Sequence, residues 1–71
     1  MLKFLYKNEF IKLIIEEDVI GFYLIVYKDP YSETSNQDYL TDSLEDAFQK
    51  SEEGFGITKE NWVSQNISLQ T

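Results

Sequence analysis

The chain has 71 residues, no cysteine, no histidine and a formal net charge of −7. A chain of this length forms one domain, so we expect a single domain over residues 1–71. The absence of Cys and His excludes disulfides, the common structural zinc sites and catalysis by a Ser–His or Cys–His pair, whereas five Phe, five Tyr and one Trp favour a folded chain over a disordered one.

The negative charge lies in the second part of the sequence. Residues 1–28 carry four lysines and four acidic residues, whereas residues 29–71 carry nine acidic residues and two lysines. Such an excess of one sign affects the choice of partner more than it affects the fold. It favours a basic partner and disfavours direct binding to nucleic acid, which is itself a polyanion.

Three apolar segments open the chain, at residues 2–6, 10–16 and 20–28. They are rich in β-branched and aromatic residues and separated by short polar breaks, which predicts three strands of an antiparallel meander. Because side chains alternate along a strand, each face of the sheet takes every second residue. The expected core-facing residues are Ile11, Leu13, Ile15, Phe22, Leu24 and Val26.

The opposite face of this predicted sheet is too apolar for a freely solvated antiparallel sheet. It would carry Phe10, Ile14, Tyr23, Ile25 and Tyr27, accompanied only by Lys12 and Glu16. Two interpretations stay open. Either another part of the chain covers this face, or it is an interface in a homodimer or with a partner, for which the candidate residues are Phe10, Tyr23, Ile25 and Tyr27.

The segment 29–41 contains the only proline and a cluster of Ser, Thr, Asn and Asp residues, which predicts a loop. A helix is then expected to start at Asp42, whose carboxylate is a candidate N-cap with Glu45 as its capping-box partner. Apolar residues recur at helical spacing until Gly54 and Gly56 end the pattern.

The last part of the chain suggests a polar turn at residues 58–61 and a short final strand. The strand pattern consists of Val63, Ile67 and Leu69. Trp62, which precedes it, is expected in the core, because buried Trp is the common case in small domains.

Five carboxylates form a stripe along the exposed side of the predicted helix: Asp42, Glu45, Asp46, Glu52 and Glu53. The first three suit the positive end of the helix dipole, but Glu52 and Glu53 lie in the last turn, where negative charge is unfavourable. Only Asp46 and Lys50 form an acid–lysine pair at i,i+4 spacing. The stripe either keeps a small apolar domain in solution or is an electrostatic docking surface for a basic protein.

Candidates for catalysis are few. Asp38 and Asp42 are the only acids near both the predicted loop and the helix start. An enzyme or small-ligand binder would therefore need a pocket that joins these two carboxylates with Tyr39. The loop lacks the ligands that set the geometry of a calcium site. We therefore expect no catalysis, no cofactor and no metal.

Residues 38–47 read Asp-Tyr-Leu-Thr-Asp-Ser-Leu-Glu-Asp-Ala, and Gly54-Phe55-Gly56-Ile57 and Trp62 follow. These residues resemble a family of short uncharacterised bacterial proteins with the pattern D-Y-L-x-D-[ST]-L-E-x-A and a [FY]-G-[IV]-x(4)-W close. The resemblance covers residues 22–63 and implies a bacterial or phage origin and a strand–loop–helix unit, without an activity to transfer. In overall profile the chain is also similar to small acidic immunity proteins that neutralise basic nuclease toxins.

Taken together, the sequence predicts an α+β fold in which a three- or four-stranded antiparallel sheet packs on one helix, in the order β-β-β-α-(β). The expected function is that of a non-enzymatic inhibitor or immunity-type protein that docks on a basic partner, such as a toxin or nuclease. A homodimeric structural domain is the alternative. With no signal peptide and no apolar run long enough to span a bilayer, a cytoplasmic location without membrane contact is expected.

Overall fold

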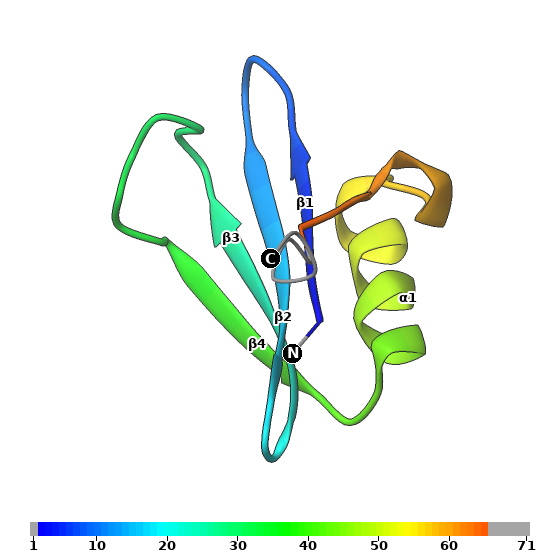
Figure 1. Cartoon of the computed structure of the whole chain (residues 1–71). Helices are drawn as coiled ribbons and strands as arrows, with labels where there is room; N and C mark the ends of the chain where they lie inside the picture. Colours follow the sequence, from blue (N-terminus) through cyan, green and yellow to red (C-terminus); the bar gives the residue numbers. More distant parts are fainter. Residues whose placement is uncertain (1, 66–71) are drawn as a thin grey trace, which may run out of the picture.

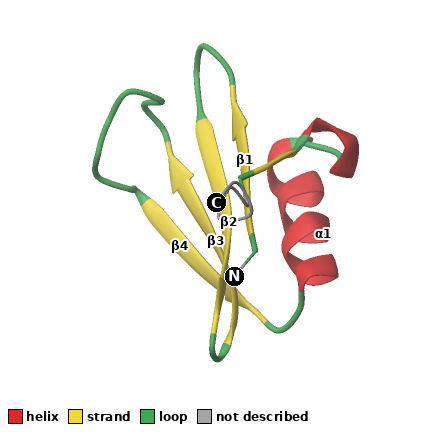
Figure 2. Cartoon of the chain, in the orientation of Figure 1, coloured by secondary structure: helices red, strands yellow, loops and turns green. Residues whose placement is uncertain are grey.

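The computed structural model describes residues 2–65. The elements in chain order are β1 (Lys3–Lys7), β2 (Lys12–Asp18), β3 (Gly21–Tyr27), β4 (Gln37–Thr41), α1 (Leu44–Phe55), the 3-10 helix η1 (Lys59–Asn61) and β5 (Val63–Ser64). The strands form one antiparallel sheet in the order β4-β3-β2-β1-β5 (Figure 1). Helix α1 covers one face of this sheet (Figure 2). The expected α+β class is confirmed, and the described residues contribute five strands where three or four were expected.

The first three strands form the expected meander. Asn8 closes the turn between β1 and β2, because its side-chain oxygen accepts hydrogen bonds from the N–H groups of Phe10 and Ile11, at 2.7 and 2.9 Å. This turn keeps Phe10 out of β2, which begins at Lys12. Phe10 is 75% exposed and lies outside the strands, so its predicted place on the sheet face with Ile14, Tyr23, Ile25 and Tyr27 is wrong.

The core lies between the sheet and α1. Its buried members are Leu13, Ile15, Leu24, Val26, Ala47, Phe48, Ile57 and Trp62. The core-facing prediction for β2 and β3 is confirmed, with Ile11 and Phe22 partly buried at the margin of the cluster. Alternation identified this face because burial on one side of a sheet imposes a period of two.

Aromatic rings connect the sheet, the helix and the C-terminal segment. The Trp62 ring centroid lies 6.3 Å from that of Tyr6 and 6.0 Å from that of Phe48. Phe48 in turn packs edge-on against Phe4 at 5.4 Å. Trp62 is only 9% exposed, so its predicted core position is confirmed, although its Nε1 has no hydrogen-bond partner among the residues that the structure describes.

Strand β4 lies in the segment that the sequence predicted as a loop. It pairs with β3 along its whole length, with Tyr39 opposite Leu24 and Thr41 opposite Phe22. The loop prediction for residues 29–41 is therefore wrong over the last five residues. An edge strand needs only one buried side and tolerates polar residues on the other, so its apolar pattern was too short to detect.

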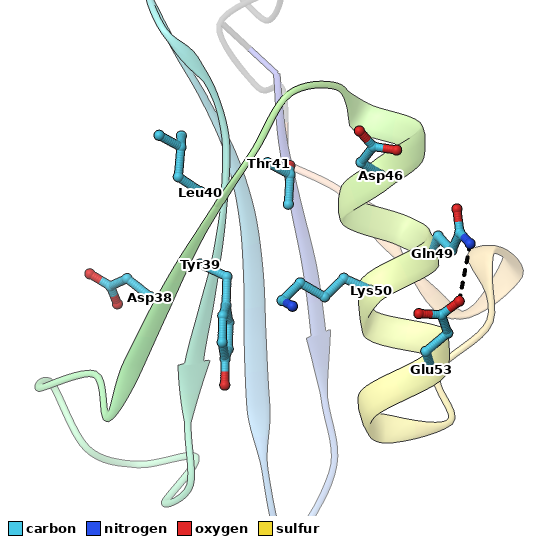
Figure 3. A pocket seen from close by; sticks show the side chains of 8 residues that line it. All are labelled: Asp38, Tyr39, Leu40, Thr41, Asp46, Gln49, Lys50 and Glu53. Atoms are coloured by element: carbon cyan, nitrogen blue, oxygen red, sulfur yellow. Dashed lines mark hydrogen bonds between the residues drawn. The ribbon is translucent and has the colours of Figure 1, made fainter.

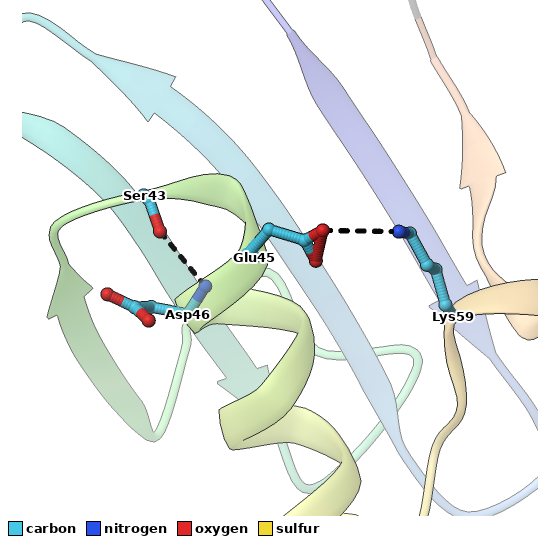
Figure 4. Close-up of polar contacts among 4 residues, drawn as sticks. All are labelled: Ser43, Glu45, Asp46 and Lys59. Carbon is cyan, nitrogen blue, oxygen red and sulfur yellow. Dashed lines mark hydrogen bonds and ion pairs between the residues drawn. The ribbon is translucent and has the colours of Figure 1, made fainter.

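The chain turns from β4 into α1 without a long connection. The Thr41 hydroxyl donates to the carbonyl oxygen of Phe22 at 2.8 Å and so fixes the end of the strand. Ser43 is the N-cap, with extended backbone and a hydroxyl that accepts the N–H of Asp46 at 3.1 Å (Figure 4). The prediction that Asp42 caps the helix is wrong by one residue.

Helix α1 ends at a glycine, as the sequence predicts. Gly56 adopts the left-handed conformation, with a φ of 72°, and its N–H donates to the carbonyl of Glu52 at 3.0 Å. Gly54 lies inside the helix and does not end it. No helix in residues 2–65 is long and apolar enough to cross a membrane.

The C-terminal segment returns to the sheet beside β1. The predicted polar turn at residues 58–61 contains η1, and β5 follows with Val63 opposite Leu5. The N–H of Gln65 extends this pairing by donating to the carbonyl of Lys3 at 2.7 Å. The other two residues of the predicted final strand, Ile67 and Leu69, lie outside the described residues.

Candidate functional site

All five carboxylates of the predicted stripe are exposed: Asp42, Glu45, Asp46, Glu52 and Glu53. Asp42 precedes the helix, between β4 and the N-cap. The other four lie on two sides of α1. Asp46 and Glu53 lie toward β4, and we call this pair the groove flank. Glu45 and Glu52 lie on the side of η1, and we call this pair the outer flank.

Lys59 of η1 partly neutralises the outer flank. Lys59 places its Nζ 3.4 Å from a carboxylate oxygen of Glu45 (Figure 4). Next to it, the pKa of the exposed Glu60 carboxyl is lowered from its usual value by hydrogen bonds, from the backbone first and then from the Thr58 side chain, with Lys59 adding a smaller effect. The groove flank differs, because no described lysine lies within ion-pair distance of Asp46 or Glu53.

A groove of about 470 Å³ runs between β4 and α1 (Figure 3). It is lined by residues 38–41 of β4 and by Asp46, Gln49, Lys50 and Glu53 of α1. A second hollow of about 490 Å³ shares Tyr39, Lys50 and Glu53 with it and continues toward Lys28, Gln37, Gly54 and Phe55. Because they share these three residues, the two hollows adjoin each other between β4 and α1.

Lys50 stands at the centre of this groove. Its Nζ lies 4.6 Å from the centroid of the Tyr39 ring, which is a cation–π distance (Figure 3). The sequence pattern had favoured Asp46 as its partner at i,i+4 spacing. The side-chain amide of Gln49 donates a hydrogen bond to the Glu53 carboxylate at 3.0 Å. This hydrogen bond holds the carboxylate at the far end of the groove flank.

The enzyme hypothesis requires a pocket that joins Asp38, Asp42 and Tyr39. Asp42 is not among the residues that line the groove. Asp38 points away from α1 (Figure 3), and its carboxylate accepts a hydrogen bond from the Ser35 hydroxyl at 3.1 Å. In this groove Asp42 therefore does not join Asp38 and Tyr39. Within residues 2–65 no group of three or more His, Cys, Asp or Glu side chains is placed to hold a metal ion.

The face of the sheet opposite α1, which we call the open face, carries the remaining predicted residues. The strand register places Tyr23, Ile25 and Tyr27 on it, all partly buried. Ile14 lies opposite Ile25 on β2, and Leu40 lies opposite Tyr23 on β4. The predicted apolar character of this face is confirmed for these positions of β2 and β3, but not for Phe10.

The open face also carries more charge than the sequence suggested. Lys7 pairs with Lys12 across the β1–β2 ladder, and Lys3 pairs with Glu16, to which its Nζ comes within 3.9 Å. Lys12 lies 4.2 Å from the centroid of the Tyr27 ring. The expectation that Lys12 and Glu16 are the only charged residues there is wrong, since β1 and β4 add charged side chains to the same face.

The groove is the feature that sequence reasoning missed. It depends on β4, and the signal for this strand was the alternation of Gln37, Tyr39 and Thr41 toward the core with Asp38 and Leu40 on the other side. Tyr and Thr are both strand-forming residues, but five residues of alternation were too few to separate a strand from a loop.

No protein-family model, no curated protein and no solved structure matches this chain. The resemblance of residues 38–47 to a bacterial family and the likeness to immunity proteins therefore stay predictions.

Proposed function

We propose that this protein is a non-enzymatic protein-binding module that docks a basic protein on the acidic side of α1, as inhibitors of the immunity type do. The observation that carries the proposal is the exposure of Asp42 and of all four carboxylates of α1. Glu52 and Glu53 oppose the helix dipole in the last turn, where no basic residue offsets them. Charge kept at an unfavourable position is better explained by a partner than by the fold.

The physical role of this surface is to steer encounter. Exposed carboxylates of one sign raise the local concentration of a cationic partner and accelerate association, more than they add to the final affinity. The groove flank is the stronger part of the surface, because Glu45 on the outer flank already has Lys59 as a partner. A basic protein that covers α1 would have its own cationic site occluded, which is how such a module inhibits.

The test begins with capture of partners by the whole protein from its native host at low salt, followed by purification of the retained protein. We expect its association rate constant to fall about tenfold or more between about 20 mM and about 500 mM salt. The variant E52Q/E53Q should associate more slowly, whereas E9Q/E33Q removes the same charge from exposed positions outside α1 and should associate as the wild type does. An association rate independent of salt, or unchanged in E52Q/E53Q, would contradict the steering role.

A second candidate is a homodimer through the open face. Lys12 and Glu16 lie equally far on either side of Ile14 in β2, and Tyr27 and Tyr23 lie in the same way about Ile25 in β3. A twofold axis across the strands at Ile14 and Ile25 would thus pair Lys12 with Glu16 of a second copy and stack the tyrosines between two sheets, and it would also place the two Asp38 side chains opposite each other.

Sedimentation at high concentration tests this candidate. The dimer predicts that Lys12→Glu weakens self-association and that the double variant K12E/E16K restores it. A monomer at all accessible concentrations would rule out the homodimer and leave the acidic surface unaffected.

A further inference from the structure

Strand β4 is an edge of the described sheet. It pairs with β3 on one side, and the order β4-β3-β2-β1-β5 leaves no strand on its other side. In an antiparallel strand, alternate residues direct their N–H and C=O groups away from the neighbour. An edge of this kind is a template for a further strand.

The groove follows this edge. Four consecutive residues, 38–41, line it, although their side chains alternate between the two faces of the sheet. No residue of β3 is among those that line the hollow, so it lies toward the side of β4 that has no neighbouring strand in the described sheet. The helix wall, from Asp46 to Glu53, is about 10 Å long at 1.5 Å per residue. Four residues of strand span about 10 Å as well, so strand and helix border the groove over the same length.

We infer that the groove accepts an extended, basic segment of the partner, which adds to β4 as a sixth strand beside α1. The inference rests on the proposed function, because the segment belongs to the basic partner. Two carboxylates, those of Asp46 and Glu53, stand on the helix wall of the first hollow, against one lysine, Lys50. This charge selects a cationic segment.

The same charge argues against a second copy as the occupant. Pairing of β4 with β4 of another molecule would bring two Asp38 carboxylates and two groove flanks together. Natural edge strands are commonly blocked by lysine or proline, and β4, with the sequence Gln-Asp-Tyr-Leu-Thr, contains neither. Like-charge repulsion thus disfavours pairing of β4 with β4 of a second copy, whereas a basic segment can pair with the same edge.

The probe is the peptide acetyl-Lys-Val-Lys-Val-Lys-Val-Lys-amide, titrated at low salt into the whole protein labelled with ¹⁵N. The inference predicts shifts of the amide signals of β4 and of the α1 residues Asp46, Gln49, Lys50 and Glu53. Two matched peptides carry N-methyl groups on all valines or on all central lysines. In an extended peptide the valine N–H groups point to one edge and the lysine N–H groups to the other. The peptide that is methylated on the edge facing β4 cannot donate hydrogen bonds to β4 and should bind at least about tenfold more weakly, whereas the other should bind like the parent.

Two charge variants of the protein separate the groove from the rest of the acidic surface. Both D46N/E53Q and E45Q/E52Q remove one carboxylate from the first turn of α1 and one from the last. The first pair is the groove flank and the second is the outer flank. We expect D46N/E53Q to weaken the peptide about tenfold and E45Q/E52Q to change it by less than about threefold.

Each contrary result has a distinct meaning. If both N-methylated peptides bind as the parent does, or if the two charge variants weaken binding equally, the peptide docks by charge alone; strand addition is then wrong and the proposed function stands. An unshifted β4 at saturating parent peptide likewise overturns strand addition. The proposed function itself fails only in its own test, if association of the captured partner does not respond to salt or to E52Q/E53Q.

Discussion

Gly21 and Gly54 occupy positions where a methyl group has opposite effects. At Gly21, which has a φ of 155°, a Cβ would overlap the backbone carbonyl oxygen of Thr41, so β3 and β4 could not keep their spacing. At Gly54, inside α1, a Cβ would meet nothing within 4 Å. Glycine in a helix costs stability relative to alanine, because it loses more backbone entropy on folding.

The prediction at these two sites is a pair of opposite changes in the free energy of unfolding, measured in urea. Gly21→Ala should lower it by about 1–3 kcal/mol, because the clash is with backbone that cannot turn aside. Gly54→Ala should raise it by about 0.5–1 kcal/mol. A Gly21→Ala variant as stable as the wild type would contradict the close approach of β3 and β4.

Trp62 is the residue whose loss the fold should tolerate least. It contacts the rings of Tyr6 and Phe48 and is almost fully buried. Replacement by alanine should cost about 3–5 kcal/mol, which is as much as the core of so small a domain supplies. Trp62→Ala should therefore be unfolded by circular dichroism at 25 °C, whereas Val63→Ala, at a side chain that is 59% exposed, should melt like the wild type.

At the scale of the elements, the start of α1 gives a direct test of the cap. Ser43→Ala removes the hydroxyl that accepts the N–H of Asp46 and should destabilise the protein by about 1 kcal/mol. Asp42→Ala should change stability by less than about 0.5 kcal/mol, since Asp42 is an exposed residue outside the helix. If denaturation ranked these two variants in the reverse order, the cap would be Asp42.

The elements that the sequence predicted are those with a repeated signal. β2 and β3 each alternate over seven residues, and α1 repeats apolar residues over three turns, so burial on one side left a visible period. The cap was misplaced because Asp42 and Ser43 are both good N-cap residues. The Thr41 hydroxyl donates a hydrogen bond to the Phe22 carbonyl and so fixes where β4 ends, two residues before the N-cap Ser43. This contact joins residues far apart in sequence.

The candidate site was predictable only in part, for the same reason. The exposed carboxylates of α1 followed from helical spacing alone. Their division into a groove flank and an outer flank did not, because it depends on β4 on one side and on Lys59 on the other. Both neighbours are tertiary contacts that local spacing does not encode.

For the molecule as a whole, charge is distributed by face. The acidic residues of α1 lie on one side of the sheet, whereas the open face on the other side carries both signs, with Lys3, Lys7 and Lys12 beside Glu16 and Asp38. The net charge of −7 is thus distributed unevenly, with an excess of acidic residues on the side of α1. Partner binding by α1 and self-association by the open face would use opposite sides of the same fold.

This separation makes hydrogen–deuterium exchange of the protein, alone and bound to its captured partner, the most direct test of the central claim. We expect slower exchange in residues 37–41 and 44–55 of the complex and unchanged exchange in β1 and β2. Protection confined to β1 and β2, with α1 unchanged, would contradict docking on the acidic side of the helix. Failure of the whole protein to retain any partner at low salt would contradict it as well.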